Sequence, residues 1–411
     1  MESSNHRDTI RLFAAAFLRA MGMGMTAVVL ALYLATLGWN AASVGALIAA
    51  SFAGAAVGTV YVSFLADHYG RRRTLVILAS LETLGALTFA ITGKGAWLFA
   101  AAFLGMINGM GKPRGASYAL EQAILPELAS SESRTMMLAW YGVILEIGVA
   151  LGSFLSGAPH LLRVWRGWAP PASYHAAWFL IAAFDFLAIP AYLGISSRVE
   201  VEAGPQIAPP ISAASKRKIS MMAGLFAMDS FGGAMLTSPL LAYWFFRRFH
   251  AGEEWIGPLF ALAAIANAIS LPVAAWLAKK IGLLNTVVFT HLPSSVFLFL
   301  LPFAPGFGWA AALFLCRESL VQMDVPTRQS YLLAIIHKEE RTFASGMTTL
   351  TRNLSRIVGS GVSGYAMQVL ALSGPLFIGG AIKMVYDLAL YYVFRRVKPP
   401  EENLGRESEA S

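Results

Sequence analysis

A succession of long apolar runs limits the fold of this chain more than any other feature of its sequence. Each run is long enough to cross the roughly 30 Å hydrocarbon core of a bilayer as an α-helix. The runs lie at about 10–36, 41–66, 74–92, 96–120, 134–158, 173–196, 219–246, 254–278, 283–303, 307–335, 342–370 and 373–394. We therefore expect an all-α integral membrane protein with twelve transmembrane helices.

The composition excludes several other classes of protein. Hydrophobic residues make up 57% of the 411 residues and charged residues 13%, and the mean hydropathy is +0.60, which is too apolar for a soluble globular protein. The net charge of +8 arises largely in short loops, where membrane topology explains it, so we expect no nucleic acid partner. The single cysteine, Cys316, lies in an apolar run, so we expect no disulfide, and we expect neither a metal site nor a cofactor.

The Lys and Arg residues outside the runs predict the orientation in the membrane. If the amino terminus is cytoplasmic, eighteen of them lie on the cytoplasmic side and five on the other. Basic residues are enriched in cytoplasmic loops, so we expect both termini to lie in the cytoplasm. The membrane is expected to be the cell membrane, that is, a plasma or inner membrane. Residues 1–11 are polar and lead into the first run without a small-residue cleavage site, so we expect that helix to be retained.

An internal repeat divides the chain into two halves of six helices. The segment Phe64–Gly70 is similar to Trp276–Gly282, 212 positions further on, and Gly22 corresponds to Gly232 at an offset of 210. Small loop insertions in a duplicated unit would produce such drifting offsets. The expected domains are an amino-terminal bundle at 1–196, a cytoplasmic linker at 197–218, a carboxyl-terminal bundle at 219–396 and a tail at 397–411.

A short polar turn separates the second and third runs. Asp67 comes first, then Gly70, and Arg71 and Arg72 follow directly. This pattern resembles the signature loop of the major facilitator superfamily of secondary transporters, with a serine and a histidine in place of the family's first glycine and first basic residue. A basic loop that serves topology alone is the alternative explanation.

The resemblance implies both a fold and a role for this turn. The fold would be two six-helix bundles related by a pseudo-two-fold axis, with a substrate site between them near the midplane. In the family this loop is a cytoplasmic gate, so Asp67 is expected to meet the positive end of the helix that begins near Arg341. The second copy of the loop has Lys279 in place of the acid.

The fifth run contains small residues at regular spacing. Gly148, Gly152, Ser153, Ser156 and Gly157 resemble the antiporter motif of the same family, with serine in place of a proline and of one glycine. Small residues let two helices approach closely. The resemblance favours export, and close packing without a transport role is the alternative.

Charged residues inside the runs are the candidates for a substrate and proton pathway, because each is costly in lipid unless it is paired or faces water. The candidates are Arg19, Arg114, Glu146, Asp229, Arg317, Glu318, Asp324 and Arg328. Glu146 is a candidate proton carrier because burial disfavours a charged carboxylate, and a structural ion pair is the alternative. Lys383 and Asp387, four residues apart, are predicted to neutralise each other, and Asp185 is predicted to be a packing residue.

Arg19 and Asp229 occupy equivalent positions in the first and seventh runs. Both lie about ten residues from the cytoplasmic start of their helix, so each is expected ~15 Å deep in the core. Opposite charges at equivalent positions lead to the hypothesis that the two residues pair across the cavity in one state of transport. The alternative is that each finds a partner in its own bundle.

The motifs that are absent narrow the function further. No H-E-x-x-H or G-x-S-x-G motif occurs, so we expect no enzyme, and no P-loop occurs, so no nucleotide drives the protein directly. The sequence predicts a monomeric secondary active transporter that moves a small organic solute by alternating access, by proton-coupled export as an antiporter. A proton-coupled importer of an organic anion is the alternative, and a membrane sensor is the alternative outside transport.

Overall fold

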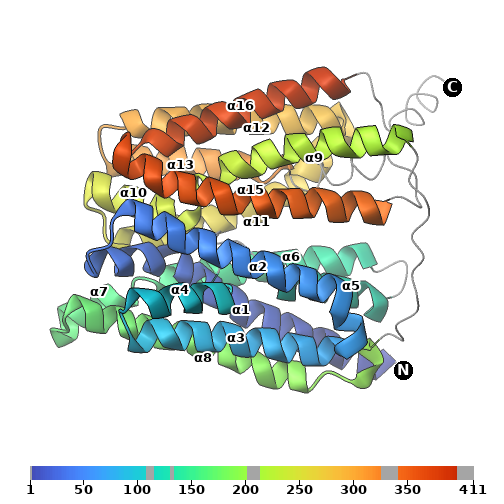
Figure 1. Ribbon diagram of the computed structural model, residues 1–411, viewed down its shortest axis with the longest axis horizontal. Coiled ribbons are helices and arrows are strands. Elements are labelled where there is room, and N and C mark those ends of the chain that lie inside the picture. Colours follow the sequence, from blue (N-terminus) through green and yellow to red (C-terminus); the bar gives the residue numbers. More distant parts are fainter. Residues whose placement is uncertain (1, 108–114, 130–133, 201–212, 325–340, 396–411) are drawn as a thin grey trace. The chain divides into compact units, whose positions relative to one another are not determined.

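The computed structural model describes residues 2–107, 115–129, 134–200, 213–324 and 341–395, and within these ranges every regular element is a helix (Figure 1). The amino-terminal half contains α1 (Glu2–Thr36), α2 (Ala41–Tyr69), α3 (Arg71–Ile91), α4 (Gly95–Leu104), α5 (Ala116–Leu128), α6 (Arg134–Leu155), α7 (Ala158–Arg166) and α8 (Pro170–Leu193). The remainder contains α9 (Ala213–Ala234), α10 (Ser238–Phe249), α11 (Glu253–Ile281), α12 (Leu283–Leu300), α13 (Phe307–Val321), α15 (Arg341–Val369) and α16 (Gly374–Phe394). Two short 3₁₀ helices follow α8 and α12, at Ser197–Val199 and Leu301–Phe303.

Nine stretches of the described residues are long and apolar enough to cross a membrane. The predicted count of twelve is therefore not confirmed. The run predicted at 96–120 contains the ten-residue α4 and, further on, the separate α5, and only 15 residues of the run at 307–335 are described as helix α13. Helix α15 has 29 residues, but Arg352, Asn353, Arg356 and many Ser and Thr residues lower its hydropathy.

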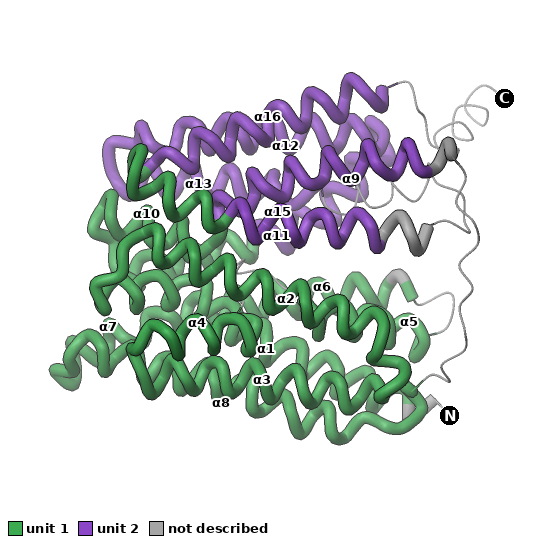
Figure 2. Tube along the Cα trace, viewed as in Figure 1, with its two compact units in different colours: residues 1–205, 237–265, 360–372 green, residues 206–236, 266–359, 373–411 purple. Residues whose placement is uncertain are grey.

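The chain divides into two compact units (Figure 2). Unit 1 comprises residues 1–205, 237–265 and 360–372, and unit 2 comprises residues 206–236, 266–359 and 373–411. Within unit 1, α1 packs against α6 and α8, and α3 packs against α8. Within unit 2, α12 packs against α13 and α16, and α9 packs against α16. The domain boundaries expected from the sequence stay predictions.

In unit 1, α1 and α6 approach each other closely at a glycine, Gly152 of α6. A Cβ built on Gly152 of α6 would lie 1.9 Å from the carbonyl oxygen of Met21 in α1, so a side chain at this position has no room. Unit 2 repeats the contact between α15 and α9, where a Cβ on Gly359 would lie 2.7 Å from the carbonyl oxygen of Phe231. Gly152 and Gly359 are 207 positions apart and Met21 and Phe231 are 210 apart, so the contact follows the repeat found in the sequence.

The turns after α2 and after α11 have the same unusual backbone conformation. Gly70 has a φ angle of 101° and Gly282 one of 87°, values that residues with a side chain rarely adopt. Each glycine lies directly between two long helices. The predicted similarity of the two loops is therefore present in the backbone.

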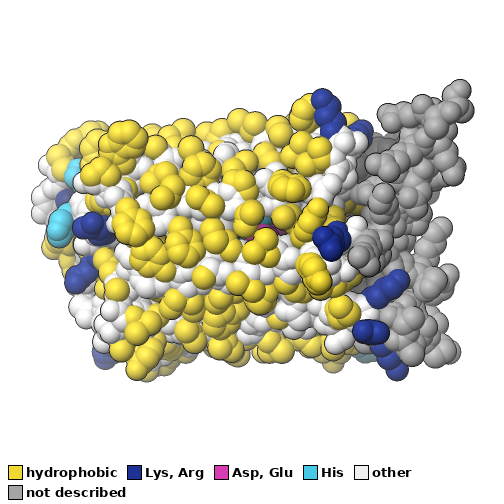
Figure 3. Space-filling model, turned by 90° about the horizontal axis from the view of Figure 1, so that it is seen from above, with side chains coloured by type: hydrophobic (Ala, Val, Ile, Leu, Met, Phe, Trp, Pro, Cys, Tyr) yellow, Lys and Arg dark blue, Asp and Glu magenta, His cyan; other side chains and the backbone are white. Residues whose placement is uncertain are grey.

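Hydrophobic side chains cover much of the face drawn in Figure 3, and Lys and Arg side chains lie toward its two ends. Large apolar residues are widely exposed, among them Phe64 at 79% and Tyr392 at 73%. Water disfavours so much exposed apolar surface, whereas the hydrocarbon core of a bilayer accommodates it. The surface agrees with a membrane-embedded protein.

Candidate functional site

Buried charged and hydroxyl side chains from four helices meet inside unit 1. Arg19 of α1 is 2% exposed, and its Nη2 lies 2.5 Å from Oε2 of Glu121 in α5. The hydroxyls of Tyr141 in α6 and Tyr192 in α8 both donate hydrogen bonds to the Glu121 carboxylate, the former at 2.6 Å. The Tyr192 hydroxyl also accepts a hydrogen bond from Nε of Arg19 at 2.8 Å. We call these four side chains the Arg19 cluster.

Two further carboxylates lie near the Arg19 cluster. Oε1 of Glu82 in α3 is 3.9 Å from Nη1 of Arg19 and accepts a hydrogen bond from the Ser117 hydroxyl at 3.3 Å. Asp185 of α8 is 8% exposed and faces α1, since a Cβ on Gly22 would lie 3.1 Å from its Oδ1. Among the described residues of this region, three carboxylates therefore surround one guanidinium group. Such a surplus of acids can accept a proton, because a bound proton removes the cost of an uncompensated charge.

A second group of buried charges lies in unit 2, around Asp229 of α9. Nζ of Lys383 in α16 lies 2.7 Å from Oδ1 of Asp229 and 3.2 Å from Nε2 of His291 in α12. Nδ1 of that imidazole lies 2.8 Å and 2.9 Å from the two carboxylate oxygens of Asp387 in α16. We call these four side chains, none more than 6% exposed, the Asp229 cluster.

Both clusters bear on expectations from the sequence. Arg19 binds Glu121 and Asp229 binds Lys383, so each has a partner in its own unit, which is the alternative that the sequence left open. The prediction that Lys383 and Asp387 neutralise each other directly is wrong. Both side chains are buried where α9 and α12 pack beside α16, and these helices supply a carboxylate and an imidazole as nearer partners.

The other candidates from the sequence are only partly described. The Arg317 guanidinium binds the carboxylate of its neighbour Glu318, which also accepts a hydrogen bond from Nδ2 of Asn267 at 3.3 Å. Asp324 is buried just beyond the end of α13, and Glu146 is half-buried in α6. Two candidates lie outside the described residues: Arg114 and Arg328.

The polar turn after α2 is held by a network of acids and arginines. Nε of Arg71 lies 2.6 Å from Oδ1 of Asp67, and its Nη1 lies 2.6 Å from Oε2 of Glu127. The backbone amides of Arg71 and Arg72 donate to the Glu200 carboxylate at 2.5 Å and 3.2 Å, so an acid occupies the positive amino-terminal end of α3. Sequence reasoning missed Glu127 and Glu200, because both are distant from the motif in the sequence.

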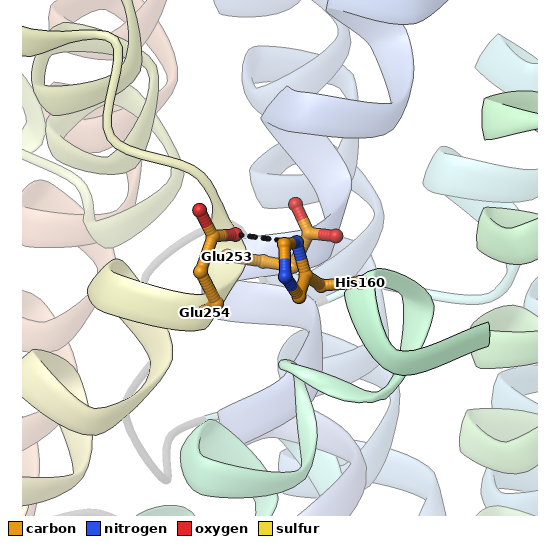
Figure 4. Close-up of side chains that lie close together, drawn as sticks. All are labelled: His160, Glu253 and Glu254. Carbon is orange, nitrogen blue, oxygen red and sulfur yellow. Dashed lines mark ion pairs between the residues drawn. The ribbon is translucent and has the colours of Figure 1, made fainter. Parts of the chain in front are cut away.

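A third group of ionisable side chains joins α7 and α8 to the start of α11 within unit 1 (Figure 4). Nδ1 of His160 lies 3.3 Å from Oε2 of Glu254, and ligand atoms of His160, Glu253 and Glu254 lie within 4.8 Å of one another, a spacing that a divalent cation could bridge. Both oxygens of Glu253 are already bound, one by the Arg163 guanidinium and the other by the Tyr174 hydroxyl at 2.8 Å. A metal would have to displace Arg163, so we interpret the group as ion pairs that hold these helices together.

Comparison with known proteins identifies the family. The family model described as Major Facilitator Superfamily matches residues 12–322 and 227–411, which together span almost the whole chain. The chain belongs to the major facilitator superfamily.

Individual relatives agree with this membership. The uncharacterized membrane protein YJR124C of Saccharomyces cerevisiae is 25% identical over 421 residues, and the match covers 94% of each chain. A mutant of the nucleoside transporter NupG has a TM-score of 0.76 at 13% identity and covers 94% of this chain and 100% of its own. A D-xylose-proton symporter has a TM-score of 0.69 at 14% identity, with 95% and 98% covered. At such low identity these two structures show a shared fold.

Membership in the major facilitator superfamily confirms the family and the fold expected from the sequence. The protein is a multi-pass membrane protein with a transporter fold, which agrees with the secondary transporter predicted above. The gate role of Asp67, Gly70, Arg71 and Arg72 stays a prediction, as does the participation of the other named residues in a substrate or proton pathway.

Proposed function

We propose that this protein is a secondary active transporter that couples the movement of a small organic solute to a proton gradient, acting as a monomer in a cell membrane with both termini in the cytoplasm. The observation that supports proton coupling is the surplus of carboxylates around Arg19. The basic loops that predicted the topology support the orientation.

Glu121 and Glu82 differ in their contacts with Arg19, and we therefore assign them different roles. Glu121 is fully buried and accepts hydrogen bonds from Arg19, Tyr141 and Tyr192. Glu82 lies 3.9 Å from the same guanidinium and is 18% exposed. Since Glu121 already balances the charge of Arg19, Glu82 is the carboxylate that we assign to proton uptake and release.

Export remains the first direction to test, on the resemblance of the small residues in α6 to an antiporter motif. The repeat weakens this argument, because Gly359 makes the same kind of close contact in unit 2 as Gly152 makes in unit 1. Packing alone accounts for a contact that occurs in both halves. Proton-coupled import is therefore the second candidate.

The experiment is transport in liposomes that contain the purified protein, with a panel of small organic solutes and an imposed pH gradient. The Glu82→Gln variant should lose solute flux driven by the pH gradient and keep exchange of solute for solute, because the site can no longer change its charge. The sign of the gradient that drives accumulation gives the direction.

A matched control is Ser80→Ala in the same helix, whose hydroxyl donates only to the carbonyl of Val76 one turn away. This variant should transport as the parent does. Full gradient-driven flux in Glu82→Gln, at equal abundance in the membrane, would contradict the assignment of the proton to Glu82.

A further inference from the structure

Helix α7 lies between two helices that are long enough to cross the bilayer. Helix α6 has 22 residues and α8 has 24, so at 1.5 Å per residue they extend ~33 Å and ~36 Å, against a hydrocarbon core of ~30 Å. The nine residues of α7 extend only ~14 Å and cannot cross that core. Figure 1 draws α7 at the end of unit 1 opposite the amino terminus. Helix α7 therefore lies at one edge of the bilayer, on the side expected to be non-cytoplasmic.

One face of α7 is polar and is bound to the protein. His160 and Arg163 are three residues apart and share this face. Nδ1 of His160 lies 3.3 Å from Oε2 of Glu254, and the Arg163 guanidinium binds the Glu253 carboxylate. Both acids belong to the first turn of α11, a helix of spanning length. These contacts hold α7 at the level where α11 enters the membrane.

The opposite face of α7 is apolar and points away from the protein. Leu161, Val164 and Trp165 follow the i, i+3, i+4 spacing of one helix face. Val164 is 63% exposed and Trp165 is 76% exposed, and Trp168, two residues beyond the end of the helix, is exposed as well. The exposed Arg166 lies between the two faces. This arrangement is the reverse of that on a water-soluble protein, where a surface helix packs its apolar face on the core.

The apolar face of α7 continues the exposed apolar surface of the helices that flank it. Phe154 near the end of α6 and Phe179 in α8 are both exposed. A helix with Trp and Leu on one face and basic residues on the other lies in the bilayer interface, with its apolar face ~5–10 Å into the boundary between headgroups and acyl chains. Tryptophan accumulates at that level. A bilayer therefore covers this face, whereas water would leave the indole and the aliphatic side chains hydrated at a cost.

We propose that α7 is a lipid-binding helix that lies along the surface of the leaflet opposite the amino terminus, with Leu161, Val164 and Trp165 among the acyl chains just below the phospholipid headgroups. The helix then joins the bilayer to the protein, because lipid contacts one face while Arg163 on the other binds Glu253. This contact with lipid goes beyond the proposed function and does not depend on it.

The test is electron paramagnetic resonance of nitroxide labels on single cysteines of the full-length protein, in liposomes of phosphatidylcholine. Cys316 is first replaced by serine, so that only the introduced cysteine reacts. Leu161→Cys and Val164→Cys place a label on the apolar face of α7. The references are Leu84→Cys, at an exposed position in the spanning helix α3, and Lys94→Cys, in the exposed turn after that helix. Power saturation compares collisions with oxygen, which concentrates in hydrocarbon, and with a nickel chelate, which stays in water.

The labels of Leu161→Cys and Val164→Cys should collide more with oxygen than with the nickel chelate. Their depth should lie between the depths of the labels at the two reference positions. A helix that lies along the surface places both labels at the same depth, whereas an upright helix would separate them by ~4.5 Å, the rise of three residues.

Three results would overturn the proposal. Labels on α7 as accessible to the nickel chelate as the label of Lys94→Cys would place the apolar face in water. Labels that neither reagent reaches would show that a protein partner or a second copy of this chain covers the face. Depths that differ by ~4.5 Å would show that α7 stands upright.

A second measurement leaves the protein unlabelled and its cysteine in place. Trp165→Phe removes one of the ten tryptophans and keeps an aromatic ring at the position. In liposomes of phosphatidylcholine brominated on its acyl chains, the fraction of tryptophan fluorescence that is quenched should fall in this variant, because a tryptophan in contact with lipid is lost. An equal or larger quenched fraction would contradict the contact of Trp165 with acyl chains.

Discussion

Replacing Gly152 by alanine tests the close contact between α1 and α6 directly. The new Cβ would lie 1.9 Å from the carbonyl oxygen of Met21 and 2.7 Å from its carbonyl carbon, both backbone atoms that cannot rotate away. The two helices would have to separate by about 1.5 Å to restore an ordinary contact of 3.4 Å. Overpacking typically costs 1–3 kcal/mol, and we expect about 3 here because a whole helix must move.

Alanine also favours a helix over glycine by up to about 1 kcal/mol, so the net loss of unfolding free energy for Gly152→Ala should be about 2 kcal/mol. The control is Gly142→Ala in the same helix, where a Cβ meets no atom within 4 Å. That variant should be more stable than the parent by up to about 1 kcal/mol. The two substitutions are chemically identical, so the difference between them isolates the contact.

The assay is equilibrium unfolding in detergent micelles, followed by the fluorescence of the ten tryptophans. Gly359→Ala should cost less than Gly152→Ala, since its Cβ would lie 2.7 Å rather than 1.9 Å from the nearest carbonyl oxygen. If Gly152→Ala and Gly142→Ala proved equally stable, the argument that this crossing admits no side chain would be refuted.

Two further predictions concern the polar turn and the ion pairs that join α7 to the start of α11, of which Figure 4 draws His160 with Glu254. Asp67→Asn should leave the fold intact, because the Asp67 side chain is half-exposed, but it should strongly reduce flux if the turn is a gate. Unchanged flux at equal abundance would remove that role. Arg163→Gln leaves the buried Glu253 without its cation and should lower the unfolding free energy by roughly 3 kcal/mol. The control Glu254→Gln breaks the contact between His160 and Glu254, whose side chains are about one-third exposed, and should change the unfolding free energy by no more than about 0.5 kcal/mol. Equal effects in both variants would show that burial does not decide the strength of these pairs.

The sequence predicted the fold well, because the signals for it are local. Apolar runs of spanning length predicted helices, and the glycine between Asp67 and Arg71 marked a turn that the structure shows with φ of 101°. The count of twelve spans is not confirmed, in part because polar residues lower the hydropathy of a predicted run. Arg352 and Arg356 do this in α15.

The partners inside the clusters could not be predicted in the same way. Spacing along one helix suggested that Lys383 pairs with Asp387, yet the partner of each is set by how α9 and α12 are rotated against α16. A helix that is apolar on most sides has no clear periodic pattern from which to read that rotation. For Glu82 and His291, the only feature of the sequence that could have indicated a place in a cluster was a polar side chain inside an apolar run.

Gly70 and Gly282 are the residues at which the two copies of the loop have the same backbone conformation. The two turns have kept their φ angles of 101° and 87°, while the residues around them have changed from Asp67 to Lys279 and from arginines to leucines. A backbone that requires glycine tolerates almost no replacement, whereas a surface charge can be exchanged at little cost to folding. In this chain the two copies of the loop therefore share the backbone conformation that requires glycine, and they do not share the charges around it.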